Sequence, residues 1–212
     1  DEYMAPRFLG MFFGAFSAES AQRGMSRLQG RLGETIAIPE LTLLDDPHRQ
    51  GANRSCFLDA EGFLTKPLPL IEEGVFSNFQ YHVESANKEK KRSTGHAVRG
   101  YAGGISTRSH NLVWPTGELN LEQLCAQNSK CLLVTQLEGQ AGCNPVSGDI
   151  SIGVQGFLIE NGRRIQPVDS ITLAGNFFDV LLNIRGSGNT YQPELTHSFI
   201  PALLIEGLTV SG

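Results

Sequence analysis

The segment Leu158–Gly162 (LIENG) constrains the fold most, because it places a tight-turn signal directly after an apolar run. Asn and Gly both tolerate positive φ, which the two-residue type I′ turn of a β-hairpin requires. A similar segment, Leu70–Gly74 (LIEEG), occurs earlier, and a third variant, Leu204–Gly207 (LIEG), precedes the apolar run Leu208–Val210. The intervals between the copies are unequal, so we interpret them as reused turn chemistry and not as a solenoid repeat. The first two copies predict hairpins.

Apolar residues recur at helical spacing between Arg7 and Leu28, which predicts a long N-terminal helix interrupted near Gly24. Shorter helices are expected at His82–Lys91, Leu119–Asn128 and Asn176–Ile184. Strands are expected at Ile36–Leu44, Cys131–Leu137, Ile150–Ile159, Ile171–Ala174 and Ile200–Ile205. The glycine-rich segment Ser93–Ser109 is predicted to be a flexible loop. These patterns indicate an α+β fold, mainly antiparallel β-sheet and barrel- or sandwich-like, with a long N-terminal helix and a few short helices.

Composition narrows the class of protein. The chain has 212 residues, of which 40% are hydrophobic, so we expect a single domain over residues 1–212. The net charge of −5 disfavours contact with the phosphate backbone, so we expect no nucleic-acid partner. No stretch approaches the roughly 18 apolar residues of a membrane span, and four cysteines without CxxC spacing favour reduced thiols in the cytoplasm. The chain starts at Asp1 without an initiator methionine, which suggests a fragment of a longer protein.

The histidines do not form a recognisable metal motif. A hydrolytic zinc site needs about three ligands that converge, commonly two histidines one helical turn apart with a nearby glutamate. The five histidines are His48, His82, His96, His110 and His197. None pairs with another at helical spacing, and the closest combination, His82 with Glu84, would direct its side chains apart on a strand or a helix. We therefore expect no catalytic residue and no metal ligand in this chain.

Cys143 is the best candidate for a nucleophile, because glycines and Pro145 mark its surroundings as an irregular loop. Activation of the thiol requires a neighbouring histidine or a helix N-terminus, and no histidine lies near Cys143 in sequence. A cysteine hydrolase that uses Cys143 with a histidine brought in by the fold stays open as an alternative. Nearby, Ser147 is expected to be a turn residue, since no GxSxG motif surrounds it.

Several strings resemble the TldD/PmbA peptidase family. They are Asp45–Pro47 (DDP), Ser93–Ala97 (STGHA), Leu132–Thr135 (LLVT), Gly142–Asp149 (GCNPVSGD), Gly156–Gly162 (GFLIENG), Pro167–Val168, Ile171–Asn176 (ITLAGN) and Pro201–Val210. They occur in order over nearly the whole chain, and the resemblance is to the C-terminal domain of the PmbA (TldE)-type subunit. Family members carry an additional N-terminal α/β domain, which these 212 residues do not include.

The resemblance implies a heterodimer in which a TldD-type subunit supplies zinc-dependent peptide hydrolysis. In that subunit a helix near the start of the domain carries HExxxH, and a late cysteine completes the zinc site. The present chain departs at both places, since it has Phe16–Gln22 (FSAESAQ) at the first and no cysteine in Gly188–Pro201. The resemblance therefore implies that this chain is the partner subunit, which helps to hold unfolded peptides. The family has also been labelled a modulator of DNA gyrase, and the resemblance extends that label to this chain.

Four polar residues are the candidate contacts for a peptide or a partner. They are Asn144, Ser147 and Asp149 in the glycine-flanked loop, and Asn176 at an expected helix start, where its side chain could cap free N–H groups. Structural turn and cap roles compete with ligand contact for each residue. A homodimeric peptide-binding module without catalysis also remains open as an alternative.

Overall fold

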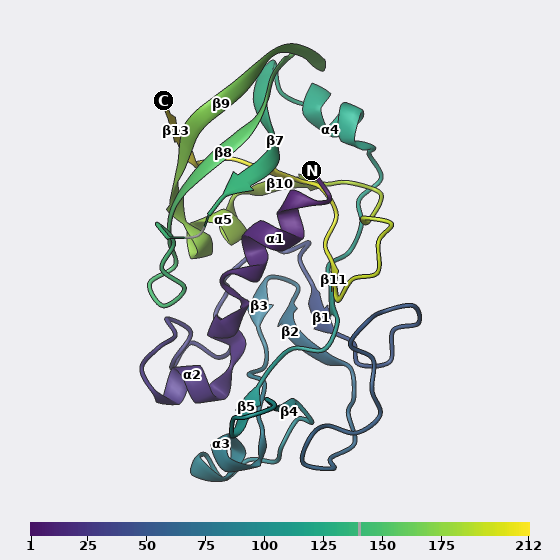
Figure 1. Ribbon diagram of the computed structural model, residues 1–212, viewed down its shortest axis with the longest axis vertical. Helices are drawn as coiled ribbons and strands as arrows, with labels where there is room; N and C mark the ends of the chain where they lie inside the picture. Colours follow the sequence, from purple (N-terminus) through teal and green to yellow (C-terminus); the bar gives the residue numbers. More distant parts are fainter. Residues whose placement is uncertain (140) are drawn as a thin grey trace. The chain divides into compact units, whose positions relative to one another are not determined.

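The computed structural model describes residues 1–139 and 141–212, and its internal contacts divide the chain into two compact units. Unit 1 comprises Asp1–Phe12, Pro115–Pro193 and Ile200–Gly212. Unit 2 comprises Phe13–Trp114 and Glu194–Phe199. Each unit is described by itself (Figure 1). The expectation of a single domain stays a prediction.

A four-stranded antiparallel sheet with the order β13-β9-β8-β7 forms the centre of unit 1 (Figure 1). Its strands are β7 (Lys130–Glu138), β8 (Asp149–Glu160), β9 (Arg163–Asn176) and β13 (Thr209–Ser211). A second, two-stranded antiparallel sheet pairs β10 (Ile184–Ser187) with β12 (Leu203–Ile205). The helices of this unit are α1 (Met4–Gly10), α4 (Leu121–Ala126) and α5 (Phe177–Leu182).

The hairpin of β8 and β9 confirms the prediction from its turn residues. Asn161 has φ 48° and Gly162 has φ 75°, so both occupy the left-handed region that a type I′ turn requires. Along β8, Ile150, Ile152 and Val154 are buried, and every second position places its side chain on the same face. This alternation gives the sheet one face that packs into the core of unit 1.

Unit 2 contains a five-stranded sheet with the order β11-β6-β1-β2-β3. Its strands are β1 (Leu43–Asp45), β2 (Leu68–Glu72), β3 (Val75–Phe76), β6 (Leu112–Val113) and β11 (Ser198–Phe199). The pairing of β11 with β6 is parallel, and the other pairings are antiparallel. A separate ribbon pairs β4 (Ala97–Arg99) with β5 (Ile105–Thr107). The helical elements are η1 (Phe13–Phe16, 3₁₀), α2 (Ala18–Gln22) and α3 (Val83–Lys88).

The second predicted hairpin is also present, as β2 and β3. Glu73 has φ 49° and Gly74 has φ 80°, the same left-handed pair as in the first hairpin. A Cβ atom on Gly74 would lie 2.7 Å from the carbonyl oxygen of Ala37, so the close approach of the backbone also requires glycine. The third copy, Leu204–Gly207, does not form a hairpin, because β12 pairs with β10 and β13 pairs with β9.

The predicted long N-terminal helix is wrong, because only the short elements α1, η1 and α2 form between Met4 and Gln22. Ser17 has an extended backbone, with φ −75° and ψ 125°, and its side chain accepts a hydrogen bond from the N–H of Ser20. A serine that caps a helix start also ends the preceding helical run. The prediction of a barrel-like sheet is wrong as well, since every sheet in the described residues is open.

Two further predictions for unit 2 need correction. Residues Ser93–Ser109 are not one flexible loop, because β4 and β5 form within them and His96 and Ala97 are buried. The strand expected at Ile36–Leu44 is limited to β1 at its C-terminal end. The three short predicted helices are confirmed as α3, α4 and α5. No helix among the described residues has the length and apolar character needed to cross a membrane.

Candidate functional site

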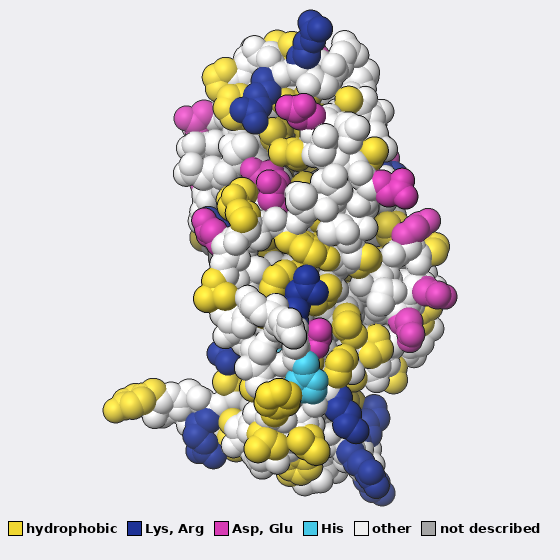
Figure 2. Space-filling view, turned by 90° about the vertical axis from the view of Figure 1, so that its right-hand side faces the viewer, with side chains coloured by type: hydrophobic (Ala, Val, Ile, Leu, Met, Phe, Trp, Pro, Cys, Tyr) yellow, Lys and Arg dark blue, Asp and Glu magenta, His cyan; other side chains and the backbone are white. Residues whose placement is uncertain are grey.

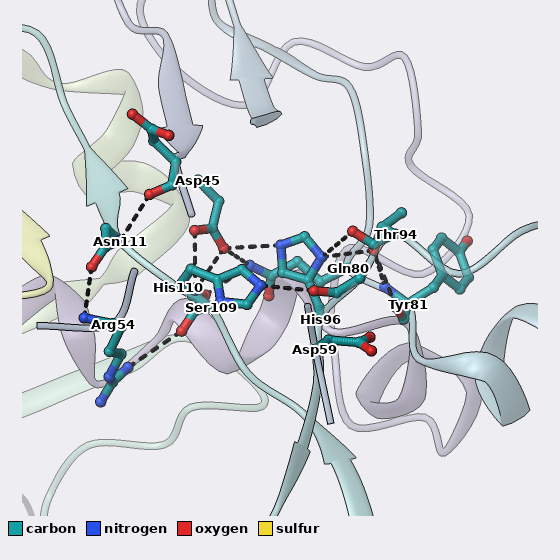
Figure 3. Close-up of polar contacts among 12 residues, drawn as sticks. Asp45, Arg54, Asp59, Gln80, Tyr81, Thr94, His96, Ser109, His110 and Asn111 are labelled. Atoms are coloured by element: carbon teal, nitrogen blue, oxygen red, sulfur yellow. Dashed lines mark hydrogen bonds and ion pairs between the residues drawn. The ribbon is translucent and has the colours of Figure 1, made fainter. Parts of the chain in front are cut away.

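A buried polar cluster lies in unit 2 and centres on Asp45, the last residue of β1 (Figure 3). The carboxylate is completely buried and accepts hydrogen bonds from Nε2 of Gln80 at 2.7 Å and from the backbone N–H of His110 at 3.0 Å. Nε2 of His96 lies 3.1 Å from Oδ2 of the same carboxylate. A buried carboxylate is stable only when such donors replace its water shell. Asp45 therefore holds together segments that are far apart in sequence.

His110 extends the cluster to a cysteine. Its Nε2 lies 2.7 Å from the carbonyl oxygen of Gly95, so this nitrogen carries the hydrogen and Nδ1 is left as an acceptor. Nδ1 faces the sulfur of Cys56 at 3.4 Å. Burial lowers the pKa of His110, and burial followed by the charges of Asp59 and Asp45 raises the pKa of the Cys56 thiol. Both groups are thus neutral at pH 7, and the pair is not an activated thiolate with an imidazolium.

Carboxylate and amide side chains connect the two segments that flank this cluster. Oδ1 of Asp59 accepts from the N–H groups of Glu61 and Phe63, and its Oδ2 accepts from the N–H of Ala97. The side chain of Asn111 accepts from the N–H of Arg54 and donates to the carbonyl of Asp46. These contacts fix residues 45–66 against residues 94–111. The cluster acts as a polar scaffold of unit 2.

The five histidines do not converge on one point. Nε2 of His48 contacts Oγ1 of Thr65 at 3.1 Å, and Nδ1 of His82 contacts Oγ1 of Thr107 at 2.9 Å. Burial, with the charges of Arg54 and Arg108, lowers the pKa of His197. Over residues 1–139 and 141–212, no group of three or more His, Cys, Asp or Glu side chains could hold a metal ion. These donors do not fit a hydrolytic zinc centre, which needs at least three protein ligands.

The helix α2 lies within Phe16–Gln22, the segment that departs from the HExxxH motif which the resemblance implies for the TldD-type subunit, and its side chains have other partners. Ser17 caps the helix, and Glu19 forms an ion pair with Arg23 at 2.6 Å. Nε2 of Gln22 donates to the backbone carbonyl of Ser85 at 2.8 Å and to the carboxylate of Glu89. The polar side chains of α2 therefore serve capping and packing within unit 2.

Cys143 is half-buried in the segment between β7 and β8 and belongs to unit 1. All five histidines lie within the residues of unit 2. The cysteine hydrolase alternative therefore finds no histidine for Cys143 within its own unit. The cysteine that does contact a histidine, Cys56, was not singled out from the sequence, because 54 residues separate it from His110.

The structure brings the four predicted contact residues together in unit 1. Oγ of Ser147 donates to Asp149 at 2.6 Å, and Nδ2 of Asn176 donates to the carbonyl of Ser147 at 3.0 Å and to Asp149 at 3.1 Å. The side chain of Asn144 accepts from the N–H groups of Val146 and Ser147. Asn176 caps α5 through the N–H of Phe178, as expected. Their contact with a peptide or partner stays a prediction.

A cavity of about 460 Å³ lies in unit 1 beside the edge strand β7. Apolar side chains from α1, α4, β7 and β12 make up much of its lining, including Phe8, Leu124, Leu133 and Leu204. Cavities of this size that are largely apolar accommodate apolar side chains or small ligands. This cavity is the concave candidate site of unit 1.

An exposed apolar loop covers residues 57–64 of unit 2. The large side chains of Phe57, Leu58, Phe63 and Leu64 are 75%, 55%, 44% and 70% exposed. Figure 2 shows hydrophobic side chains gathered on the surface toward the lower end of the face in view. Within unit 2, the ring centroids of His48 and Phe57 lie 5.2 Å apart. Contiguous exposed apolar groups of this kind mark interaction surfaces. The loop is the candidate surface of unit 2 for a protein partner.

Comparison with known proteins places the chain in a family. The sequence model of the PmbA/TldA metallopeptidase C-terminal domain matches residues 1–212. Metalloprotease PmbA of Escherichia coli O157:H7 is 35% identical over 189 residues, which cover 89% of this chain and 40% of that protein. The PmbA homolog of Haemophilus influenzae is 35% identical over 210 residues, which cover 99% of this chain and 44% of that protein.

Solved structures agree with this assignment. TldE from Thermococcus kodakarensis superposes with a TM-score of 0.84 at 28% identity, over 96% of this chain and 48% of that one. A Thermotoga maritima protein described as a candidate modulator of a DNA gyrase superposes with a TM-score of 0.87 at 34% identity, over 96% of this chain and 46% of that one. The chain spans less than half the length of these relatives. It belongs to the TldD/PmbA metallopeptidase family and corresponds to the C-terminal domain of a PmbA (TldE)-type subunit.

Proposed function

We propose that this chain is part of a PmbA (TldE)-type subunit that acts as the partner of a TldD-type zinc metallopeptidase subunit in a cytoplasmic heterodimer. In this proposal the TldD-type subunit holds the hydrolytic zinc, and the present chain helps to form the chamber for unfolded peptides. All four cysteines are free thiols, which supports a reducing compartment.

The observation that carries the proposal is the chemistry of α2. Where the zinc-binding subunit has a helix with two histidines and a glutamate, α2 offers a capping serine and a glutamate paired with Arg23. Two buried imidazoles, His96 and His110, contact Asp45 and the Gly95 carbonyl instead. Such partners satisfy the ring nitrogens that a metal would need.

Two surfaces support a role in binding. The cavity of unit 1 is lined by both apolar and polar residues and adjoins β7, an edge strand of its sheet. An edge strand can pair with an extended peptide through its backbone. The apolar loop of unit 2 offers exposed side chains of the kind that a subunit interface covers. Recognition through backbone and apolar contacts suits unfolded peptides of varied sequence.

Reconstitution tests this proposal. The full-length protein that contains this chain is purified alone and together with the TldD-type subunit of the same organism. Zinc content per subunit and cleavage of an unfolded peptide are measured, and light scattering reports the oligomer. For the protein alone we expect no cleavage and little bound zinc. For the mixture we expect cleavage of the peptide and zinc bound to the TldD-type subunit. Cleavage by the protein alone with bound zinc would contradict the proposal, and a homodimer unable to join the TldD-type subunit would favour the peptide-binding module.

A further inference from the structure

Two cysteines lie close together on the wall of the cavity in unit 1. Cys125 belongs to the last turn of α4, and Cys131 is the second residue of β7. The thiol of Cys131 donates to the carbonyl oxygen of Cys125, with the sulfur 3.6 Å from that oxygen. Both are free, half-buried and part of the cavity lining. The reversal of the chain between α4 and β7 therefore juxtaposes two thiols.

The titration of Cys131 agrees with this proximity. Burial, followed by the charge of the neighbouring Cys125 and a hydrogen bond with it, raises the pKa of the Cys131 thiol to about 11. A thiol with such a pKa is almost entirely protonated at pH 7, so it reacts slowly there. The same property makes it a poor leaving group, and a disulfide that contains it resists reduction.

The helix that carries Cys125 is lightly anchored. Of the six residues of α4, all of which are described, only Leu124 is buried. The hydrogen bonds between Asn120 and Gln123 cap the first turn of α4. They do not hold its last turn, which carries Cys125. A disulfide requires Cα atoms roughly 4.4–6.8 Å apart, and a surface helix with one buried residue can move to reach that spacing at low cost.

We propose that Cys125 and Cys131 form a dithiol site that low-molecular-weight disulfides oxidise to an intramolecular disulfide, which fixes α4 to β7 at the wall of the cavity. The inference does not depend on the proposed partner function, because it rests only on the two thiols and the elements that carry them.

The reaction is balanced by thiol–disulfide exchange. One thiol loses its proton, and its thiolate attacks a sulfur of the reagent R–S–S–R, which releases one R–S⁻ that takes up a proton. The second protein thiol, also as thiolate, then attacks the mixed disulfide and displaces the second R–S⁻. The protein loses two electrons and two protons, and one reagent molecule becomes two R–SH.

Oxidised glutathione is the probe for this site. The full-length protein is incubated with it at about pH 8.5, where ordinary thiols are partly ionised. Remaining thiols are then alkylated, and peptides are analysed by mass spectrometry without reduction. We expect Cys125 and Cys131 to escape alkylation together. They should be found joined by a disulfide, in a product that carries no attached glutathione. In Cys131→Ser, the thiol of Cys125 should instead retain glutathione. The double variant Cys56→Ser/Cys143→Ser should still form the link, because neither residue takes part.

The rate at which the disulfide between Cys125 and Cys131 forms provides a second readout on the unaltered protein. It should rise at least several-fold between about pH 7 and pH 8.5, as the thiolate fraction increases. Full alkylation of both cysteines after the incubation would overturn the proposal. Glutathione that stays on Cys125 or Cys131 in the unaltered protein would overturn it as well, since a close second thiol displaces a mixed disulfide.

Discussion

Nε2 of His96 lies 3.1 Å from Oδ2 of Asp45, and both side chains are completely buried. This contact joins β1 to a segment 51 residues later in the chain. The same carboxyl group accepts from Gln80 and from the backbone of His110, so one buried side chain organises the polar interior of unit 2. Its loss would leave several donors unsatisfied in a site that water does not reach.

Asp45→Ala is therefore expected to lower the free energy of unfolding by about 3–5 kcal/mol, because it leaves the buried donors of Gln80 and His110 without their acceptor at about 1–3 kcal/mol each. Urea denaturation followed by circular dichroism measures this change. Glu72→Gln is the matched control, because Glu72 is exposed at the end of β2, and it should change stability by about 0.5 kcal/mol or less. Equal effects of the two substitutions would contradict the role of Asp45.

Stability is expected to fall as the pH drops below about 6.5, in part because of His110. Burial lowers the pKa of His110 below its ordinary value of 6.5 in the folded chain. The unfolded chain therefore binds the proton first, and protonation favours unfolding. The stability that neutral His110 contributes is fully present above its pKa in the unfolded chain. It is lost as the pH falls from 6.5 toward the lower pKa of His110 in the folded chain. The lowered pKa of His197 acts in the same direction.

His110→Gln provides the measurement for this pH dependence. The glutamine side chain can still donate to the Gly95 carbonyl but does not titrate. Between about pH 7.5 and pH 5.5 the free energy of unfolding should decrease less in this variant than in the parent protein. The difference between the two should be at most about 1.4 kcal/mol for each pH unit. An identical pH profile for variant and parent would show that His110 does not contribute.

Gly74→Ala should destabilise unit 2 more than Gly62→Ala. Both glycines have positive φ, 80° and 81°, so alanine is strained at either position. Only at Gly74 would the new Cβ also meet backbone, 2.7 Å from the carbonyl oxygen of Ala37, whereas at Gly62 nothing lies within 4 Å. We expect about 1–2 kcal/mol for Gly62→Ala and clearly more for Gly74→Ala, measured by thermal or urea unfolding. A smaller effect at Gly74 would argue against the tight turn of β2 and β3.

Cys143→Ala should leave peptide turnover by the reconstituted complex unchanged, because unit 1 contains no histidine to activate the thiol. The variant is assayed with an unfolded peptide at several concentrations, so that binding and turnover are separated. A large loss of kcat at unchanged complex formation would revive the cysteine hydrolase.

Local chemistry explains what the sequence could predict. The hairpins at Glu73–Gly74 and Asn161–Gly162 and the cap at Asn176 depend on a few adjacent residues, so their signals are visible in sequence. The long N-terminal helix failed because helical spacing persists through Ser17, where the backbone is extended. The cluster of Asp45 and His96 was missed because it depends on contacts across 51 residues. Both segments were nonetheless among the strings that carried the family resemblance, Asp45–Pro47 and Ser93–Ala97.

In the proposed complex, the hydrolytic centre lies in the TldD-type subunit and not in this chain. The most direct test compares two substitutions in the reconstituted complex: Glu19→Gln in α2 here, and glutamate to glutamine in the HExxxH helix of the TldD-type subunit. Glu19 is bound to Arg23, so its replacement should keep peptide cleavage within about two-fold of the parent, as for a surface ion pair. The change in the other subunit should abolish cleavage. Loss of cleavage with Glu19→Gln, in a complex that still assembles, would mean that this chain contributes to the hydrolytic centre.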